Sequence, residues 1–467
     1  MKETIILDPL TRLEGAGKVK IDIAKGALKD LQLSVMSGPR FFEYLLTNKP
    51  AEEAPRISER ICGICYVNHH LVSVKAVEDA WGVEVPEVAT LLRRTLNAAS
   101  FITSHALHLA FLALPDLMDL KERNFLGISN ANPGLAETAV QLHEYGNRVV
   151  TEIGGRLVHV VTAVPGGMTK GLTGETRYKL LVEGRVAMTN VRKIADAVLG
   201  LYEEREDDPK EYMEQNTNYM GLVNGSGGHE LYDGDIRVRG GDGKGLCQFK
   251  PQEYDNFLEE TTSDHSFTKI LYMKQKGAEK GLGRVGPLAR FNVMDGMRWK
   301  VAGEYLKSYD KLFGRPCNDT AAYNLARAIE LVGAVEEVLD GLANDMITSE
   351  KTREPVKPKA GVGHAFVEAP RGLLYHSYEV DDTGIIKKVN IVAPTTFNHK
   401  NIENNLRAWA EENVDVLSNA KTRDTALWGL EKIVRAYDPC LSCSVHMVEV
   451  DLTIDGEKID TRGEARG

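Results

Sequence analysis

The spacing of hydrophobic and polar positions changes twice in the first half of the chain. Residues 3–36 alternate in a strand-like way in the segments TIILD, KVKIDIA and LKDLQLSVM, which glycine-bearing turns separate. From residue 41 to about 202, apolar positions recur with a helical period, in stretches too long and too apolar on one side for surface helices. The pattern predicts an N-terminal sheet followed by a packed helical bundle.

The second half mixes both periods. Residues 222–247 are rich in Gly and Asp and predict a small β-excursion with hairpin turns; helical spacing returns at 323–345 and again at 425–438. Between these helices, residues 372–394 read as two strands joined by an Asp-Asp-Thr-Gly turn. The whole predicts a predominantly helical α+β fold with a central bundle and small sheets at the N-terminus and in the C-terminal half. With no internal repeat or low-complexity linker, we expect residues 1–446 to form a single interwoven domain.

Composition excludes several classes of protein. Of 467 residues, 43% are hydrophobic and 27% charged, as in an ordinary globular protein. The net charge of −10 argues against nucleic acid as a partner. The sequence contains no run of about 18 apolar residues, so we predict no membrane-spanning segment. The first residues lack the apolar core and cleavage site of a secretory signal, so we expect a cytoplasmic protein.

The six cysteines include two CxxC pairs, in RICGICYVNHH (60–70) and DPCLSCSVH (438–446). Thiolates at this spacing can converge on one metal or close a disulfide. A thioredoxin-like redox pair, two independent structural thiol pairs and a four-cysteine zinc site remain open. Zinc-ribbon pairs are usually about 15–20 residues apart. Here residues 66–439 intervene, so the whole fold would have to assemble a shared site.

The flanking residues carry a resemblance. Two motifs stand out: RxCGxC with His69 four residues after it, and DPCxxCxxH near the C-terminus. They accompany six further sequence blocks, which occur in the order typical of one enzyme family: TRLEG (11–15), GPRFFE (38–43), SHALH (104–108), GRLVH (155–159), EAPRG (368–372) and APTTFN (393–398). Over essentially its full length the chain resembles the large, catalytic subunit of nickel–iron hydrogenases. GPRFFE, LALPD and SCSVH resemble the cytoplasmic, NAD(P)-linked, multimeric group.

The resemblance implies the family's large-subunit fold and reversible heterolytic cleavage or production of H2. By resemblance, Cys62 and Cys440 bind nickel terminally, while Cys65 and Cys443 bridge nickel to an iron that carries two cyanides and one carbon monoxide. Soft thiolates suit such metals. The backbone around Arg371 and the hydroxyl of Thr395 match the family's donors to the cyanides. Without its motif, Thr395 would read as an ordinary strand-end residue.

Two further side chains match catalytic positions of the family. The Arg371 guanidinium would hang over the open metal face; Asp438 is a candidate counter-charge, although Asp before Pro also begins turns. Glu14 matches the glutamate that takes the proton from Cys440; outside TRLEG it would read as a solvated surface residue. Many relatives have His where this chain has Ala16, which puts any role of that His in doubt here.

A second metal is also implied. Glu43 and His446, with a backbone carbonyl near Ile391, match the ligands of a buried magnesium (or iron) ion, and such oxygen ligands suit a hard cation. Alone, Glu43 would read as a helix-face charge. The remaining residues of interest are read as structural: the core histidines His69, His70, His105, His108 and His159, and the cysteines Cys247 and Cys317.

The chain has no further cysteine cluster and no GxGxxG after a strand. We therefore expect no iron–sulfur cluster or flavin in it, and expect an iron–sulfur small subunit, flavin- or NAD(P)-binding subunits and a maturation protease as partners. The protease would remove residues 447–467 after His446. NAD(P), ferredoxin-coupled bifurcation, deazaflavin and heterodisulfide reductase stay open as acceptors. The alternatives to a hydrogenase are a metal-free subunit like that of respiratory complex I and a zinc-stabilised scaffold.

Overall fold

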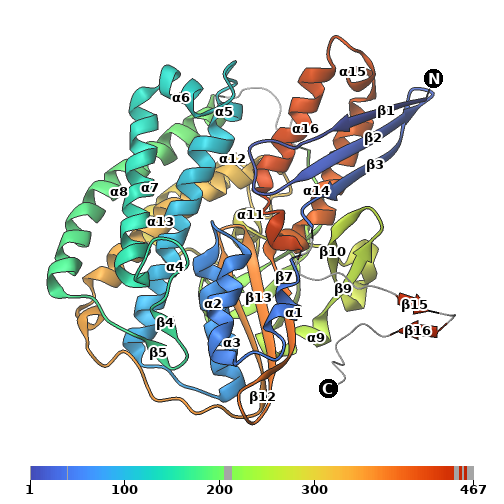
Figure 1. Ribbon diagram of the computed structural model, residues 1–467. Coiled ribbons are helices and arrows are strands. Elements are labelled where there is room, and N and C mark those ends of the chain that lie inside the picture. The colour runs from blue at the N-terminus through green and yellow to red at the C-terminus, as the bar shows by residue number, and fades with distance from the viewer. Residues whose placement is uncertain (1, 39, 205–212, 446–451, 455–456, 460–467) are drawn as a thin grey trace.

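The N-terminal strands form a three-stranded antiparallel sheet in the order β1-β2-β3, with β1 Lys2–Leu7, β2 Gly17–Ala24 and β3 Ala27–Val35. This computed structural model describes residues 2–38, 40–204, 213–445, 452–454 and 457–459. Along β2, Val19, Ile21 and Ile23 are buried and the residues between them are partly exposed. The predicted alternation is therefore confirmed, and the sheet packs through β3 against helix α14 (Figure 1).

The helical bundle fills one side of the molecule (Figure 1). Its long members are α3 Tyr66–Trp81, α4 Glu87–Leu107, α7 Pro133–Gly154, α8 Gly174–Glu203 and α13 Ala322–Ala343. Helix α13 packs against both α4 and α8 and is buried over most of its length, including the polar side chains of Asn324, Arg327 and Glu330. The predicted predominantly helical α+β architecture is confirmed.

Helix α4 continues without a break into a π-helical segment, η3 His108–Ala113, and then α5 Leu114–Leu117. By length and composition the stretch Glu87–Leu117 could cross a membrane, but 78% of its most apolar window is buried within the structure. That burial is typical of a core helix. Short π-helical segments interrupt α-helices mainly near functional sites.

Further sheets follow in the second half of the chain. Strands β12 Gly361–Ala369, β13 Gly372–Val380 and β14 Ile386–Val392 form an antiparallel sheet that packs on α3. The predicted β-excursion becomes β6 Asn218–Val223, β7 Asp235–Arg239 and β8 Gly245–Phe249, to which β11 Gly283–Arg284 adds in parallel. The hairpin β9 Leu258–Ser263 and β10 Ser266–Met273 was not predicted, nor was β12.

Two helices of the C-terminal half carry or support the cysteine segment: α14 Pro394–Glu412, which was not predicted, and α16 Arg423–Tyr437, which was. The other elements are short or peripheral: α1 Phe42–Leu46, η1 Ala51–Glu53, α2 Ala54–Ser58, η2 Glu59–Ile61, α6 Phe125–Ala131, β4 Ala163–Val164, β5 Gly167–Met168, η5 Pro251–Glu253, α9 Tyr254–Phe257, η6 Lys274–Lys276, α10 Gly277–Lys280, α11 Pro287–Val293, α12 Lys300–Leu312, η7 Asp345–Thr348, α15 Val414–Ser418, η8 Ser442–Ser444, β15 Leu452–Ile454 and β16 Glu457–Ile459.

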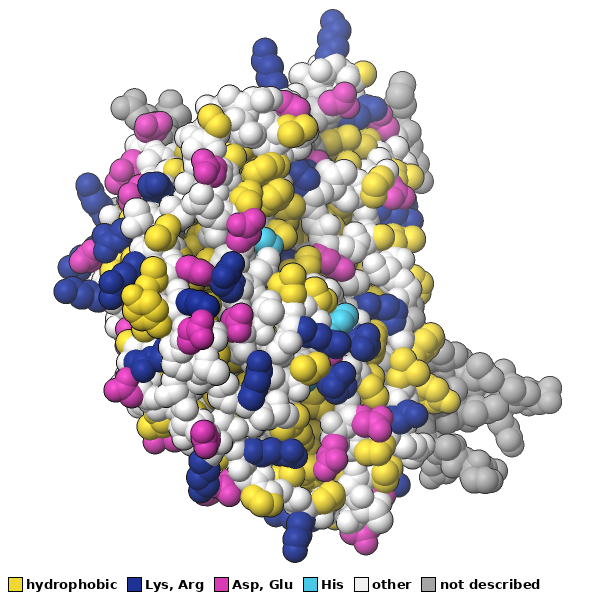
Figure 2. Space-filling model, turned by 60° about the vertical axis from the view of Figure 1, so that its left-hand side comes forward, with side chains coloured by type: hydrophobic (Ala, Val, Ile, Leu, Met, Phe, Trp, Pro, Cys, Tyr) yellow, Lys and Arg dark blue, Asp and Glu magenta, His cyan; other side chains and the backbone are white. Residues whose placement is uncertain are grey.

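On the face shown in Figure 2, basic and acidic side chains are interspersed. That face carries no continuous basic stripe of the kind that a phosphate backbone requires.

Candidate metal centre

The two CxxC pairs lie at opposite ends of the chain and at the ends of helices. Cys65 immediately precedes α3, with Cys62 in the turn after η2. Helix α16 ends at Tyr437 because Asp438 adopts a left-handed conformation (φ 55°) and Pro439 follows it. Cys440 comes directly after this stop, and Cys443 lies in η8.

The four sulfur atoms converge. All lie within 4.8 Å of one another, and all four residues are buried and free of disulfides. Cys62 Sγ is 3.6 Å from Cys440 Sγ, Cys65 Sγ is 3.4 Å from Cys443 Sγ, and the sulfurs of Cys440 and Cys443 are 2.6 Å apart. Two independent thiol pairs do not describe this arrangement; the whole fold builds one cage.

The electrostatics of the cage favour a cation. Burial raises the pKa of Cys440 and of Cys443 well above the usual range, whereas hydrogen bonds from Cys440, Cys443 and Cys62 lower the pKa of Cys65. One thiolate therefore forms easily, and a second or third requires positive charge beside it. Four soft donors within this distance fit a bound transition metal or a metal pair.

Arg371 and Asp438 form a buried ion pair beside the sulfurs. Arg371 Nη2 lies 3.0 Å from Asp438 Oδ1, and Arg371 Nε donates to the Asp438 backbone oxygen at 2.8 Å. The candidate counter-charge is therefore in contact. Burial opposes the charge on Arg371, but Asp438 and the cysteine sulfurs raise its pKa well above normal. Arg371 Nη1 has no hydrogen-bond partner among the described residues, which leaves one buried donor free for a ligand.

Glu14 approaches the cage from the N-terminal segment. The Cys440 thiol donates to Glu14 Oε2 over 3.1 Å, and the Leu441 N–H donates to the Glu14 backbone oxygen at 3.0 Å. Ser442 holds the carboxylate twice, through its N–H to Oε2 at 3.0 Å and its hydroxyl to Oε1. Gly15 must be glycine here, because with φ +88° a Cβ would lie 2.8 Å from Ser442 N. The neighbouring Ala16 is exposed.

Thr395 also contacts the cysteine segment: its Oγ1 accepts the Cys440 N–H at 2.8 Å. Thr395 is buried at the start of α14. Because its Oγ1 acts as the acceptor in this contact, the hydroxyl proton remains available to a neighbour. The residue therefore orients Cys440.

Glu43, on α1, is buried, and burial raises its pKa to about 7. The Ile391 N–H donates to Glu43 Oε1 at 2.8 Å. The observed contact thus involves the amide of Ile391 rather than the carbonyl that the resemblance implies. A hollow of about 340 Å³ opens beside Glu43, lined also by Glu260 and Lys269. His446 lies outside the described residues.

Sequence reasoning missed two residues that tie the site together. Arg40 Nη2 donates to the Ile61 oxygen at 2.5 Å and to the Ser442 oxygen at 2.7 Å, joining the two cysteine segments. Arg40 lies in the block GPRFFE, in which the resemblance points only to Glu43. Ser442, which binds Glu14, lies between the second pair of cysteines with no separate signal.

The buried histidines near the cage have partners, as expected of core histidines. His69 Nδ1 is 3.1 Å from His376 Nε2, and His376 Nδ1 is 2.8 Å from the Tyr378 hydroxyl. His70 contacts Glu59 at 2.9 Å and the Ala163 oxygen at 2.7 Å. These contacts hold the start of α3, and with it Cys65.

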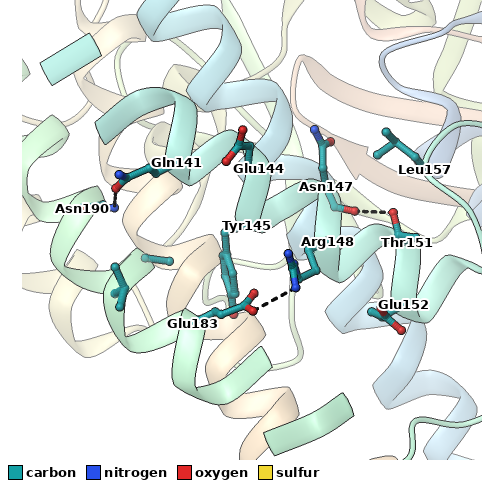
Figure 3. Close-up of a pocket in the computed structure, with 12 residues that line it drawn as sticks. Gln141, Glu144, Tyr145, Asn147, Arg148, Thr151, Glu152, Leu157, Glu183 and Asn190 are labelled. Atoms are coloured by element: carbon teal, nitrogen blue, oxygen red, sulfur yellow. Dashed lines mark hydrogen bonds and ion pairs between the residues drawn. The ribbon is translucent and has the colours of Figure 1, made fainter. Parts of the chain in front are cut away.

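A groove of about 810 Å³ lies elsewhere, between α7 and α8 (Figure 3). Most of the residues that line it are of polar or charged type, with Arg148 Nη1 3.2 Å from Glu183 Oε1 and Asn190 Nδ2 2.9 Å from Gln141 Oε1. None of the predicted site residues lines it.

Profiles of known protein families match this chain over the segments that carry the four cysteines. The profile described as nickel-dependent hydrogenase matches residues 40–192 and 228–446, and one described as HoxL-like matches residues 4–37. The chain belongs to the nickel-dependent hydrogenase family. It is the large subunit of such an enzyme, an oxidoreductase that acts on H2.

Relatives of this hydrogenase subunit span nearly its full length. One subunit of the F420-non-reducing hydrogenase vhu, from Methanocaldococcus jannaschii, is 41% identical over 413 residues, covering 87% of this chain and 98% of the relative. The NAD-reducing hydrogenase HoxS subunit beta of Cupriavidus necator is 32% identical, covering 96% and 95%. A solved NAD+-reducing nickel–iron hydrogenase in the H2-reduced state superposes with a TM-score of 0.91 at 30% identity, covering 95% of this chain and 99% of that one.

Proposed function

We propose that this hydrogenase subunit cleaves and forms H2 heterolytically at a nickel–iron centre held by Cys62, Cys65, Cys440 and Cys443. The convergence of four buried sulfurs from the two ends of the chain is the observation that carries the proposal. Cys62 and Cys440 would hold nickel, with Cys65 and Cys443 shared with iron. When bound, the metal pair with its cyanide and carbon monoxide ligands supplies the H2-splitting chemistry and accepts the electrons.

The proton leaves through the chain's own groups. The Cys440 thiol already donates toward Glu14 Oε2 over 3.1 Å, a separation that suits transfer to a carboxylate. Ser442 fixes the orientation of that carboxylate through two donors, so no reorganisation is needed before the transfer. Glu14 is itself partly exposed, which gives the proton a short way to solvent.

Arg371 acts on the cage through its guanidinium, which is held beside the cysteine sulfurs by Asp438. Its contacts with Asp438 fix the guanidinium plane, and the unpartnered Nη1 is a preorganised donor for a polarised H2 or a cyanide ligand. The backbone near Arg371 and the Thr395 hydroxyl would complete the donors to the cyanides. These groups do the orienting while the thiolates do the binding.

We further propose a magnesium or iron(II) ion beside Glu43, with the Ile391 backbone and His446 as its other protein ligands. A buried carboxylate next to a hollow of about 340 Å³ is a suitable hard donor. The ion would offset the burial that otherwise raises the pKa of Glu43. Residues 447–467 would form an extension that a maturation protease removes; the hydrogenase profile ends its match at residue 446.

The names of the relatives support a proposal for the electron route. We propose that electrons pass to an iron–sulfur small subunit, then onward to NAD(P) or an electron-bifurcating flavin module, in a cytoplasmic complex. The match to a NAD-reducing HoxS subunit supports the first acceptor. The higher identity to subunits named F420-non-reducing hydrogenase supports a different one. Acceptor preference of the purified complex distinguishes them.

Cysteine replacement tests the proposal. Cys440→Ser and Cys65→Ser should each abolish nickel incorporation and H2-dependent dye reduction, because a hydroxyl is a poor ligand for these soft metals. Cys247→Ser is the matched control, since Cys247 is a free, half-buried cysteine outside the cage. It should keep both nickel and activity. Normal nickel with full activity in Cys440→Ser or Cys65→Ser contradicts the proposed centre.

A further inference from the structure

Asp116 is a buried carboxylate that the proposed mechanism does not use. It lies in α5, directly after the π-helical segment η3, and is 2% exposed. Its Oδ1 accepts from Arg12 Nη2 at 2.5 Å and from Trp428 Nε1 at 2.8 Å, and its Oδ2 accepts from Arg435 Nη1 at 2.8 Å. Three side chains from the two ends of the sequence thus meet on one carboxylate.

Two of these partners belong to the segments that carry the proton-transfer pair. Arg12 is two residues before Glu14 and has a left-handed backbone (φ 55°), which a non-glycine residue keeps only when its surroundings hold it. Arg435 lies in the last turn of α16, five residues before Cys440. Asp116 therefore joins the segment that presents the proton acceptor to the helix that presents the donor.

Further contacts make this junction rigid. Arg435 Nε and Nη2 donate to the backbone oxygen and the hydroxyl of Thr11, each at 3.1 Å, and Arg12 Nη1 donates to the Leu112 oxygen at 2.8 Å. Glu431 accepts from Thr11 and lies 2.6 Å from Arg435 Nη2. Two cations and two carboxylates are thus balanced. Without Asp116, the two guanidinium groups of Arg12 and Arg435 would repel each other, with only the carboxylate of Glu431 to offset their charge.

The geometry that depends on this junction is short-range. The Cys440 Sγ–Glu14 Oε2 distance is 3.1 Å, so a relative shift of about 1 Å between the two segments breaks the contact. Misplacement of that size costs a reaction about a hundredfold in rate. The Leu441 N–H bond to the Glu14 backbone fixes the segments on the cage side. The Asp116 contacts fix them two residues before Glu14 and five residues before Cys440.

We propose that Asp116 is a positioning residue for proton transfer: through Arg12 and Arg435 it sets the distance between Glu14 and Cys440. The inference rests on the proposed role of Glu14. Asp116 itself touches neither substrate nor metal. Its removal should slow the proton step of a fully loaded centre rather than prevent loading.

The test is a double-mutant cycle on the intact complex, with all rates expressed per bound nickel. Asp116→Asn keeps the side-chain shape and removes the charge, and should lower H/D exchange and H2-dependent dye reduction about ten- to a hundredfold with KM for H2 unchanged. Glu14→Gln with Asp116→Asn should be no more than about twofold slower than Glu14→Gln alone, because both changes act on one step. Glu78→Gln is the control: Glu78 forms a buried, two-bonded pair with Arg93 away from Glu14, and its rate per nickel should stay at the wild-type level.

The outcomes separate the two claims. If Glu14→Gln is slow while Asp116→Asn turns over at the wild-type rate per nickel, or if the two effects multiply, positioning by Asp116 is overturned and the role of Glu14 stands. If Glu14→Gln exchanges at the wild-type rate, both are overturned. Should Asp116→Asn yield no loaded protein, Arg12→Lys tests the same junction: the ammonium cannot reach both Asp116 and the Leu112 oxygen, so a wild-type rate per nickel in that variant overturns the proposal.

Discussion

Glu14→Gln isolates proton transfer from assembly of the metal centre. Glutamine has the same shape as glutamate but cannot take up a proton. Its carbonyl oxygen can still accept the Ser442 N–H, and its amide can donate to the Ser442 hydroxyl, which accepts as readily as it donates. The variant should therefore fold, bind nickel and keep the side chain beside Cys440.

The expected size follows from the contact that is lost. General acid–base groups contribute about 10²- to 10⁴-fold to rates, which corresponds to about 2.7–5.4 kcal/mol of activation free energy. Cys440 Sγ and Glu14 Oε2 are 3.1 Å apart, which leaves no room for a water molecule between them. The proton is therefore transferred directly to the carboxylate, and glutamine cannot accept it. We expect turnover and H/D exchange to fall within that range.

The assay measures H2-dependent dye reduction and H/D exchange per bound nickel, in the wild type and in the variant. Glu411→Gln serves as the control, since Glu411 is an exposed carboxylate on α14, away from the cage. It should behave as wild type. Exchange within about threefold of wild type in Glu14→Gln, with normal nickel, would refute the assigned proton route and require another acceptor for the Cys440 proton.

Three further predictions concern charge, pH and processing. Arg371→Lys should keep nickel but lose about a hundredfold in turnover, because an ammonium cannot reproduce the planar fork; wild-type turnover removes Arg371 from the mechanism. His399 is buried on α14, and burial lowers its pKa to about 4. Between about pH 6.5 and 4 the imidazole is therefore protonated in the unfolded chain but not in the folded protein. The free energy of unfolding should be highest above that window and fall within it by up to ~1.4 kcal/mol per pH unit for this group. In His399→Gln the midpoint of urea unfolding should decline less steeply as the pH falls. A decline as steep as in the wild type would contradict this role of His399. Intact mass of active enzyme should show a chain ending at His446; the whole 51.6-kDa chain would contradict processing.

Local pattern was enough for the elements with one clear period. The N-terminal strands alternate cleanly because one face is buried, and apolar residues recur along α13 with a helical period. Helix α14 escaped because its sequence, PTTFNHKNIENNLRAWAEE, buries many polar side chains, including Asn401 and Asn405, so no apolar stripe marks it. Strand β12 is buried over its second half, which removes the alternation that would reveal it.

The cysteines of the site could be predicted because their flanking motifs are local. The contacts that orient them could not. Arg40 bridges the two cysteine segments through backbone oxygens of Ile61 and Ser442, and any residue type there would present the same oxygen. Asp116 likewise gains its meaning only when α5, the segment around Arg12 and α16 come together. Such partners depend on tertiary packing and carry no sequence spacing of their own.

Metal analysis tests the central claim most directly. The purified complex should contain nickel at close to one atom per large subunit, and Cys440→Ser should lose that nickel. Iron should exceed what the iron–sulfur partner requires by about one atom, or by about two if the ion beside Glu43 is iron. The four-sulfur cage would then hold the pair that acts on H2. One zinc per chain, or no metal in an otherwise folded wild-type protein that neither reduces dye with H2 nor exchanges H for D, would contradict the account.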